Sequence, residues 1–189
     1  MLMDAKRTVD RQWIQGALEQ YEGPLTIYAA RLLGDVDRAR DVVQDTFLKL
    51  WQADRATVDG YLAKWLYTVC RNRALDVRRK EHRMTTLGER SVETAAADEA
   101  RREADGGGVV ALVADLPQRQ QEAVRLKFQG GLSYREIAEV MDTTANNVGV
   151  LLHTAIRTIR EKLAAAGTAP APGKGAAALT DRPGESTTR

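Results

Sequence analysis

The apolar residues of this chain recur at intervals of three and four positions, the spacing that places them on one face of an α-helix. The pattern extends from about Asp10 to Arg83 and again from about Val109 to Leu163. The alternation of apolar and polar residues that is typical of half-buried strands is absent from the sequence. We therefore expect an all-α fold in which each helix buries one apolar face.

Changes in composition divide the chain into parts. Residues 10–83 are expected to form a first helical domain, and residues 109–164 a second. Between them, residues 84–108 are polar and acidic and end in three consecutive glycines, which is typical of a flexible linker. Residues 165–189 are rich in Ala, Pro, Gly and Thr and hold too little apolar surface to fold, so we expect a disordered tail.

Two breaks are expected inside the first domain. Pro24 should interrupt the first apolar pattern, because a proline inside a helix removes a backbone hydrogen bond. Gly34 and Asp35 should separate the second and third helices. A fourth helix is expected to begin near Val58 and to continue into the basic run at residues 71–80, which would present cations to phosphate groups.

Three side chains of this fourth helix are candidates either for function or for packing. Tyr61 and Trp65 could stack on nucleic-acid bases, and Cys70 could act as a redox-sensitive thiol. All three share their spacing with leucine and valine residues of the same helix. We therefore expect them to be buried in the core of the first domain.

The second domain contains the pattern of a helix-turn-helix. Pro117 suits the first position of a helix that ends at Gly130 and Gly131. Ser133 and Glu136 then have the spacing of a capping box, in which each side chain accepts a hydrogen bond from the other residue's backbone. A short helix, a tight turn and a longer helix would follow.

The longer helix of this motif would read DNA. Thr144 is the expected N-cap, after a turn at Asp142 and Thr143. Asn146 and Asn147 lie in the first turn, where an asparagine can bond to N6 and N7 of adenine or can merely cap the helix. More distant cations of the same helix would contact phosphates.

Composition and motif content exclude several other classes of protein. The 189 residues carry a net charge of +2, and Cys70 is the only cysteine, so a disulfide framework is impossible and a reducing cytoplasm is expected. His82 and His153 are isolated, and catalytic or phosphate-loop motifs are absent from the sequence. We therefore expect no enzyme activity, no metal, no cofactor, no signal peptide and no insertion into a membrane.

Two segments of the first domain have distinctive sequences, DVVQDTFLKLW at residues 41–51 and WLYTVCRNRALDVRR at residues 65–79. Together with the helix-turn-helix that follows, they resemble bacterial RNA polymerase sigma factors of the small extracytoplasmic-function (ECF) subgroup. Residues 41–51 look like the helix that binds core polymerase, and residues 65–79 look like the helix over the −10 promoter element. Residues 116–163 resemble the −35-binding domain. The resemblance implies a region 2 helical bundle and a region 4 helix-turn-helix joined by a flexible linker.

The resemblance also implies a role for each matching residue. Contacts with core polymerase would come from Asp41, Gln44, Asp45 and Leu48. Contacts with the −10 region would come from Asn72, Arg73, Asp76, Arg78, Arg79 and Lys80. Contacts with the −35 element would come from Tyr134, Arg135, Thr144, Asn146, Asn147, Gly149, Val150, His153 and Arg157. The expected partners are core RNA polymerase, through its β′ clamp and β subunits, and promoter DNA; an anti-sigma factor is a further candidate, and the free protein is expected to be a monomer.

The reading helix departs from the family pattern at one place. Many sigma factors of this subgroup carry Lys or Arg, then Ser, then Arg after the valine of this helix, where this chain has Gly149, Val150 and Leu151. Recognition of a −35 element would then be weak, would use different contacts, or would rely on close approach of the backbone at Gly149. The alternative function is a helix-turn-helix regulator that never binds core polymerase.

Overall fold

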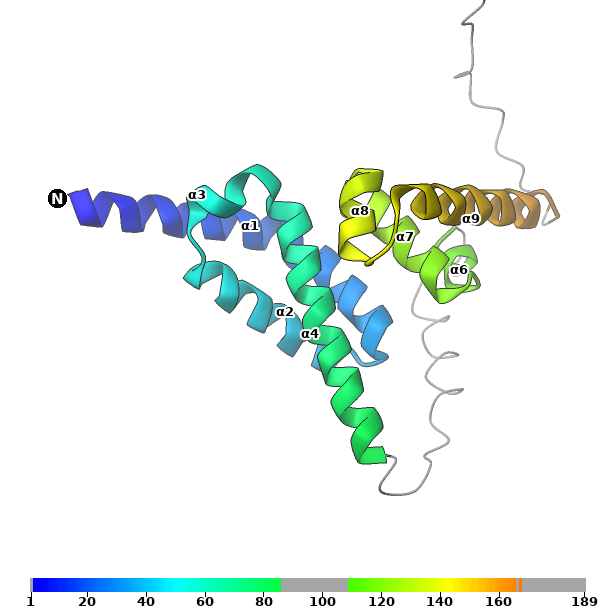
Figure 1. The fold of residues 1–189 in the computed structure, drawn as a ribbon, viewed down its shortest axis with the longest axis horizontal. Coiled ribbons are helices and arrows are strands. Elements are labelled where there is room, and N and C mark those ends of the chain that lie inside the picture. Colours follow the sequence, from blue (N-terminus) through cyan, green and yellow to red (C-terminus); the bar gives the residue numbers. More distant parts are fainter. Residues whose placement is uncertain (1, 86–108, 166, 168–189) are drawn as a thin grey trace, which may run out of the picture.

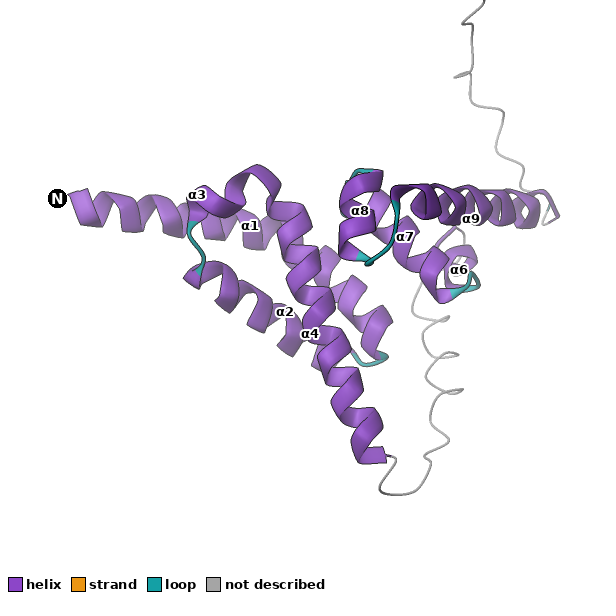
Figure 2. Cartoon of the chain, viewed as in Figure 1, coloured by secondary structure: helices purple, strands orange, loops and turns teal. Residues whose placement is uncertain are grey.

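The computed structural model of the chain describes residues 2–85, 109–165 and 167. Within these residues the regular structure is helical throughout, with short turns between the helices (Figure 2). The expected all-α fold is therefore confirmed. Most of the expected linker and nearly all of the expected tail lie outside the described residues, although the last helix before the gap continues to Thr85.

The first helical unit consists of four α-helices and one short 3₁₀-helix. Its elements are α1 (Leu2–Leu33), α2 (Val36–Gln52), α3 (Arg55–Val58), η1 (Asp59–Tyr61) and α4 (Leu62–Thr85). Helices α1, α2 and α4 pack on one another in pairs around a shared apolar core, and the C-terminal half of α4 projects beyond the other two (Figure 1).

Helix α1 is continuous, so the expected interruption at Pro24 is wrong. Pro24 lacks the N–H that would bond to the carbonyl group four residues earlier, which removes one helical hydrogen bond. Ala17 before the proline and Leu25 and Tyr28 after it are nevertheless buried where α1 packs on α2 and α4. Burial on both sides of the proline outweighs the lost bond and keeps the helix in one piece.

The break between α1 and α2 lies where the sequence predicted it. Gly34 has a positive φ of 86°, a conformation that glycine adopts without strain, and its N–H donates to the carbonyl of Ala30 at 2.8 Å. The Asp35 carboxylate then caps α2 by accepting from the backbone N–H groups of Asp37 and Arg38. Local chemistry alone therefore sets this turn.

The expected fourth helix is divided. Val58 closes α3 and Tyr61 closes η1, so both precede α4. Tyr61 is 44% exposed, and the expectation that it is buried is wrong because its spacing is not continuous with the register of α4. Trp65 is half-buried, and Cys70 is fully buried, which raises the pKa of its thiol to about 12. Cys70 is therefore an inert packing residue.

The second helical unit consists of α6 (Val109–Ala114), α7 (Gln118–Phe128), α8 (Tyr134–Val140) and α9 (Ala145–Ala165). The capping box is formed: the Glu136 N–H donates to the Ser133 hydroxyl, and the Ser133 N–H donates to the Glu136 carboxylate. Asp142 takes a φ of 50° in the turn, and Thr144 caps α9. Helices α8 and α9 thus form the predicted helix-turn-helix. Pro117 lies one position earlier than expected, at the N-cap of α7 instead of its first helical position.

The two helical units pack against each other where α4 meets α8 (Figure 1), and a buried polar cluster joins α7 to α1 and α4. Glu122 of α7 is 8% exposed, and its Oε1 accepts from the Tyr28 hydroxyl at 2.8 Å and from Arg71 Nε at 2.7 Å. Burial and the neighbouring Glu122 raise the pKa of Tyr28 well above its usual value, which keeps the phenol protonated as a donor. At the edge of the interface, Lys64 pairs with Glu139 at 2.5 Å.

A glycine of the second unit fits against a tyrosine of the first. A Cβ atom at Gly130 would lie 2.9 Å from the ring atom Cε2 of Tyr67 and 2.8 Å from the carbonyl oxygen of Leu126. Tyr67 is fully buried and makes an edge-to-face contact with the ring of Tyr28, with centroids 5.2 Å apart. The interface therefore has the close complementarity of a packed core.

Candidate functional site

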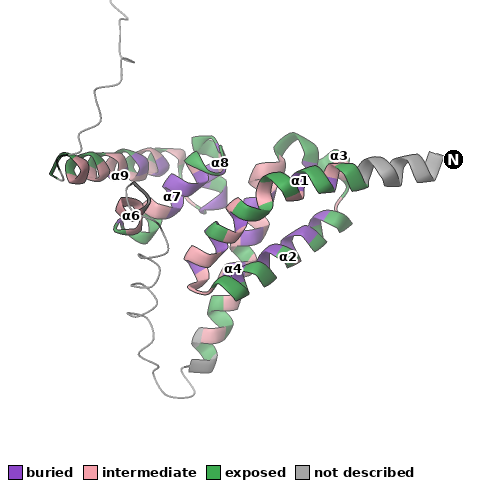
Figure 3. Ribbon diagram, turned by 180° about the vertical axis from the view of Figure 1, so that it is seen from behind, coloured by how far each residue is buried: buried purple, intermediate pink, exposed green. Residues whose placement is uncertain are grey.

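The outer face of α2 carries the residues that the sequence assigned to polymerase binding. Asp41, Gln44 and Leu48 are exposed, and Leu48 exposes 55% of its surface. The opposite face of α2 is buried against α1 and α4. These side chains do not maintain the fold, so they are available to a partner (Figure 3).

A groove of about 860 Å³ between α1 and α2 adjoins this face. Leu48 and Gln44 line it, together with Trp51 of α2 and Ile27 of α1, which are 58% and 50% exposed. Trp51 is the last residue of the segment that resembles the polymerase-binding helix, and the sequence did not single out Ile27. The signal for Trp51 was its position three residues after Leu48, which places both on one face of the helix.

Asp45 and Arg73 are bonded to each other, although the sequence assigned them to different partners. Arg73 Nε of α4 donates to Asp45 Oδ2 of α2 at 2.8 Å, and the two side chains are 38% and 40% exposed. The pair therefore links α2 to α4. A change at either residue would remove this link between the helices, which contributes less than about 1 kcal/mol, as well as any contact with a partner.

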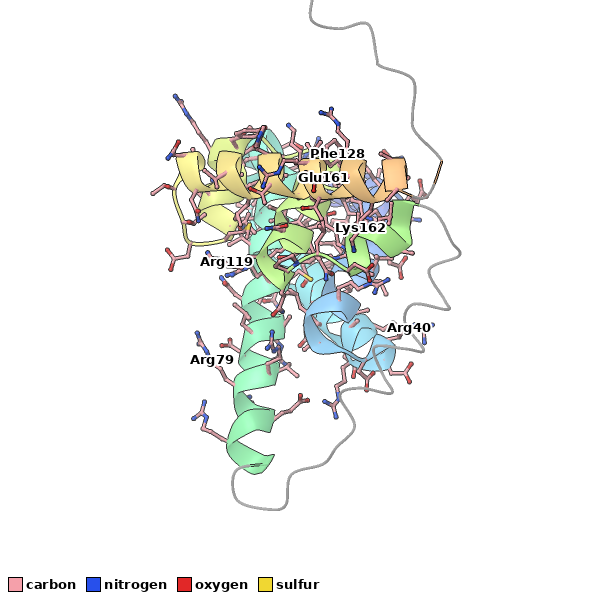
Figure 4. The ribbon with its side chains drawn as sticks, turned by 90° about the vertical axis from the view of Figure 1, so that its right-hand side faces the viewer. Arg40, Arg79, Arg119, Phe128, Glu161 and Lys162 are labelled. Atoms are coloured by element: carbon pink, nitrogen blue, oxygen red, sulfur yellow. The ribbon has the colours of Figure 1, made fainter. Side chains whose placement is uncertain are left out.

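The projecting half of α4 presents the rest of the basic run to solvent. The exposed residues of this surface are Asn72, Asp76, Arg78, Arg79 and Lys80. Arg79 extends away from the helix, and its contact with Asp76 on the same helix is long, at 3.5 Å (Figure 4). Exposed cations on a helix that stands clear of the core can contact the phosphates of a nucleic acid.

The start of α9 and the start of α8 form a third surface. Its exposed members are Tyr134, Arg135, Thr144, Asn146, Val150, His153 and Arg157, and its half-buried members are Asn147 and Gly149. A shallow hollow of about 460 Å³ lies among Tyr134, Asn146, Gly149, Val150 and His153. Polar and apolar groups thus lie side by side on the helix that a helix-turn-helix inserts into the major groove.

The two asparagines of α9 have different environments. Asn147 is half-buried; its Nδ2 donates to the Thr143 hydroxyl at 2.8 Å, and its backbone N–H donates to the Thr144 hydroxyl at 3.2 Å. Asn147 therefore holds the turn that precedes α9. Asn146 is exposed and is the one of the pair whose amide is directed to the outer surface.

We expect Asn146→Ala and Asn147→Ala to weaken DNA binding in different ways. Asn146→Ala should reduce discrimination at one base pair by roughly 1–3 kcal/mol, because a bidentate contact with a base edge is lost. Asn147→Ala should weaken binding to all sequences alike, because it loosens the turn. Competition binding against a set of single-base-pair variants measures both effects. If Asn147→Ala instead reduces discrimination at one base pair and Asn146→Ala does not, then Asn147 is the residue that contacts a base.

Within residues 11–83 and 111–165, wherever side chains are described, His, Cys, Asp and Glu form no group of three or more that could hold a metal ion. None of the described helices is both long enough and apolar enough to cross a membrane.

A helix-turn-helix with an accessible second helix, joined to a helical unit that presents a basic helix, is typical of a DNA-binding protein. Residues 17–84 match the family Sigma-70 region 2, and residues 108–159 match the family Sigma-70, region 4. The chain is 30% identical over 150 residues to the ECF RNA polymerase sigma factor SigL of Mycobacterium tuberculosis, covering 75% of this chain and 84% of that protein.

Other similar proteins agree with this match. The ECF RNA polymerase sigma factor BldN of Streptomyces coelicolor is 29% identical over 153 residues, covering 77% of this chain and 58% of BldN. The fold is similar to that of the sigma factor RpoE from Bartonella quintana, which was solved in complex with the anti-sigma factor NepR. The TM-score is 0.55 and the sequence identity is 22%, and the match covers 79% of this chain and 96% of the RpoE chain.

The chain belongs to the ECF family of RNA polymerase sigma factors. It acts in transcription initiation by directing RNA polymerase to promoters, and members of this family are initiation factors rather than enzymes. The alternative of a regulator that never binds polymerase is not favoured, because residues 17–84 of the first helical unit match region 2.

Proposed function

We propose that this sigma factor binds the β′ clamp of core RNA polymerase through the outer face of α2. Asp41, Gln44, Asp45 and Leu48 would make the contact. The support is the exposure of Leu48 beside the groove lined by Ile27 and Trp51, since a cluster of exposed apolar residues marks a protein-binding surface. The groove would accept apolar side chains of the polymerase, including those of its β subunit.

We propose that the projecting half of α4 binds the −10 region and that α8 and α9 bind the −35 element. On α4, Arg78, Arg79 and Lys80 would bind phosphates, and Asn72, Arg73 and Asp76 would lie against the bases. On the second unit, Tyr134, Asn146 and Val150 would face the major groove, flanked by Arg135 and Arg157 at the backbone. The division of the chain into domains at residues 10–83 and 109–164 is part of this proposal.

Simultaneous binding of both promoter elements requires the two units to separate. The −10 and −35 elements are centred about 25 base pairs apart, which is roughly 85 Å of B-form DNA at 3.4 Å per base pair. In the present arrangement α4 and α8 are in direct contact, with Lys64 bonded to Glu139. We propose that this packed form is the one that the protein takes before it engages a promoter.

Two further aspects of the proposal concern partners and location. RpoE was solved bound to an anti-sigma factor, and we propose that an anti-sigma factor also binds this chain. We propose that the free protein is a monomer in the cytoplasm, where polymerase and promoter DNA are found. The exposed polar surfaces of α4 and α9 suit contact with nucleic acid rather than with a second copy.

The observation that carries the proposal is the combination of a reading helix and an exposed apolar face on separate helical units. Run-off transcription with purified core polymerase and a pool of genomic fragments tests it. We expect discrete transcripts that require this protein and are absent with core polymerase alone. DNA binding without any association with core polymerase would contradict the proposal and favour a simple regulator.

A further inference from the structure

The hollow on the reading helix exists because position 149 has no side chain. A Cβ atom built on Gly149 would meet its nearest neighbour, Cε2 of Tyr134, at 3.8 Å. Any longer side chain would extend into the space of about 460 Å³ that lies among Gly149, Tyr134 and Val150. Glycine costs roughly 1 kcal/mol relative to alanine inside a helix, so the open space is maintained at the expense of helix stability.

The walls of the hollow are apolar and accessible. Val150 is 56% exposed and Tyr134 is 45% exposed, and neither contributes to the core of the second unit. Tyr134 is the first residue of α8, and Gly149 and Val150 lie in the second turn of α9, close to the N-terminus of the reading helix. Residues at this end of a reading helix contact base edges in the major groove.

The rim of the hollow is polar, and the two helices that form it carry exposed arginines. Asn146 and His153 line its edge, and Arg135 and Arg157 are exposed on the same two helices. Phosphate groups would be attracted to the two arginines, and Asn146 would meet a base edge. This distribution of charge suits DNA better than an apolar protein partner.

Among the groups that base pairs present in the major groove, the C5-methyl group of thymine is the apolar one. We propose that the hollow formed by Tyr134, Gly149 and Val150 reads thymine in the −35 element by packing against this methyl group. The inference rests on the proposed function of α9 as the −35 reader. Specificity for thymine would then come from Gly149 and Val150, the positions at which this chain lacks the polar side chains common in related sigma factors.

The test replaces the thymines of the −35 element one at a time by deoxyuridine, which lacks only the methyl group. The probe is a promoter fragment identified by run-off transcription, bound by the full chain together with core polymerase. At one or two thymines we expect the substitution to weaken binding about fourfold, the effect of one buried methyl group. At the other thymines we expect no change.

Two variants separate packing from general affinity. Val150→Ala should bring the thymine-to-deoxyuridine ratio at the sensitive position close to one, because the wall of the hollow is removed. Arg160→Gln, at an exposed position further along α9, should weaken binding to both DNAs equally and leave the ratio unchanged.

The outcomes distinguish this inference from the proposed function. Promoter-specific transcription that is insensitive to every deoxyuridine substitution would overturn methyl recognition and leave the −35 assignment intact. Recognition of the methyl group by the hollow would also be overturned if the thymine-to-deoxyuridine binding ratio at a sensitive position is unchanged in Val150→Ala. Another contact would then read the methyl group. Failure of the wild-type protein to bind the −35 element at all would overturn both proposals.

Discussion

Glu122→Ala is expected to separate the two helical units without unfolding either of them. Glu122 accepts from Tyr28 and from Arg71, which is 17% exposed, so the alanine variant leaves a cation with little solvation and a phenol without an acceptor. Removing one partner of a buried ion pair costs roughly 3–5 kcal/mol. Separation of the units would return Arg71 to water and relieve this cost. Small-angle scattering should therefore report a larger radius of gyration, with the helical content by circular dichroism unchanged.

The matched control is Glu139→Ala, which removes an ion pair across the same interface at its solvent-exposed edge. Lys64 and Glu139 are 26% and 60% exposed, and such a pair contributes less than about 1 kcal/mol. We expect this variant to stay compact. Gly130→Ala is a second variant at the same interface: its methyl group would collide with the Tyr67 ring, which favours the open form, and with the Leu126 carbonyl of its own unit, which must shift in both forms. An unchanged radius of gyration in both Glu122→Ala and Gly130→Ala would show that the buried cluster does not hold the units together.

Leu48→Glu combined with Gln44→Ala is expected to abolish binding to core polymerase. Both residues are exposed on α2, so the protein should fold normally, while a carboxylate is introduced beside the apolar groove. Loss of a central interface residue costs roughly 2–4 kcal/mol, which corresponds to about 30- to 1,000-fold in affinity. Binding to core polymerase and run-off transcription measure the loss, and thermal unfolding checks that the fold is retained.

Lys49→Gln is the control for this pair, since Lys49 is exposed on the same helix but is not among the residues that line the groove. Its affinity for core polymerase should stay within a few-fold of the wild-type value. Asp45→Arg is a poor test of the same surface, because it would place a second cation against Arg73 and disturb the packing of α2 on α4. Full polymerase binding by the Gln44 and Leu48 double variant would contradict the assignment of α2.

Much of the fold was predictable because local chemistry sets it. The apolar stripe of α2, the capping box at Ser133 and Glu136, and the turn at Gly34 each depend on residues within a few positions of one another. The same reasoning failed at Pro24 and at Tyr61. At Pro24, tertiary burial overrode a local signal; at Tyr61, a short 3₁₀-helix shifted the register that the spacing argument assumed.

The candidate site was predictable in its residues but not in their relations to one another. The sequence identified Asn146 and Asn147 together, and the fold then engaged one of them in the turn and left the other exposed. Asp45 and Arg73 were both identified, but their mutual bond joins positions 28 residues apart. Ile27 gave no signal, because its significance depends on α1 lying beside Leu48 and Trp51.

The sequence by itself determined that the chain is helical, where α2, α8 and α9 begin, and that it is similar to sigma factors. Hydrogen bonds and apolar spacing within a few residues are sufficient for these features. Only the tertiary structure decided which faces meet: Arg71 with Glu122, Gly130 with Tyr67, and Gly149 with Tyr134 across an open hollow. Such contacts depend on how whole helices pack, and residue spacing along the chain does not specify that packing.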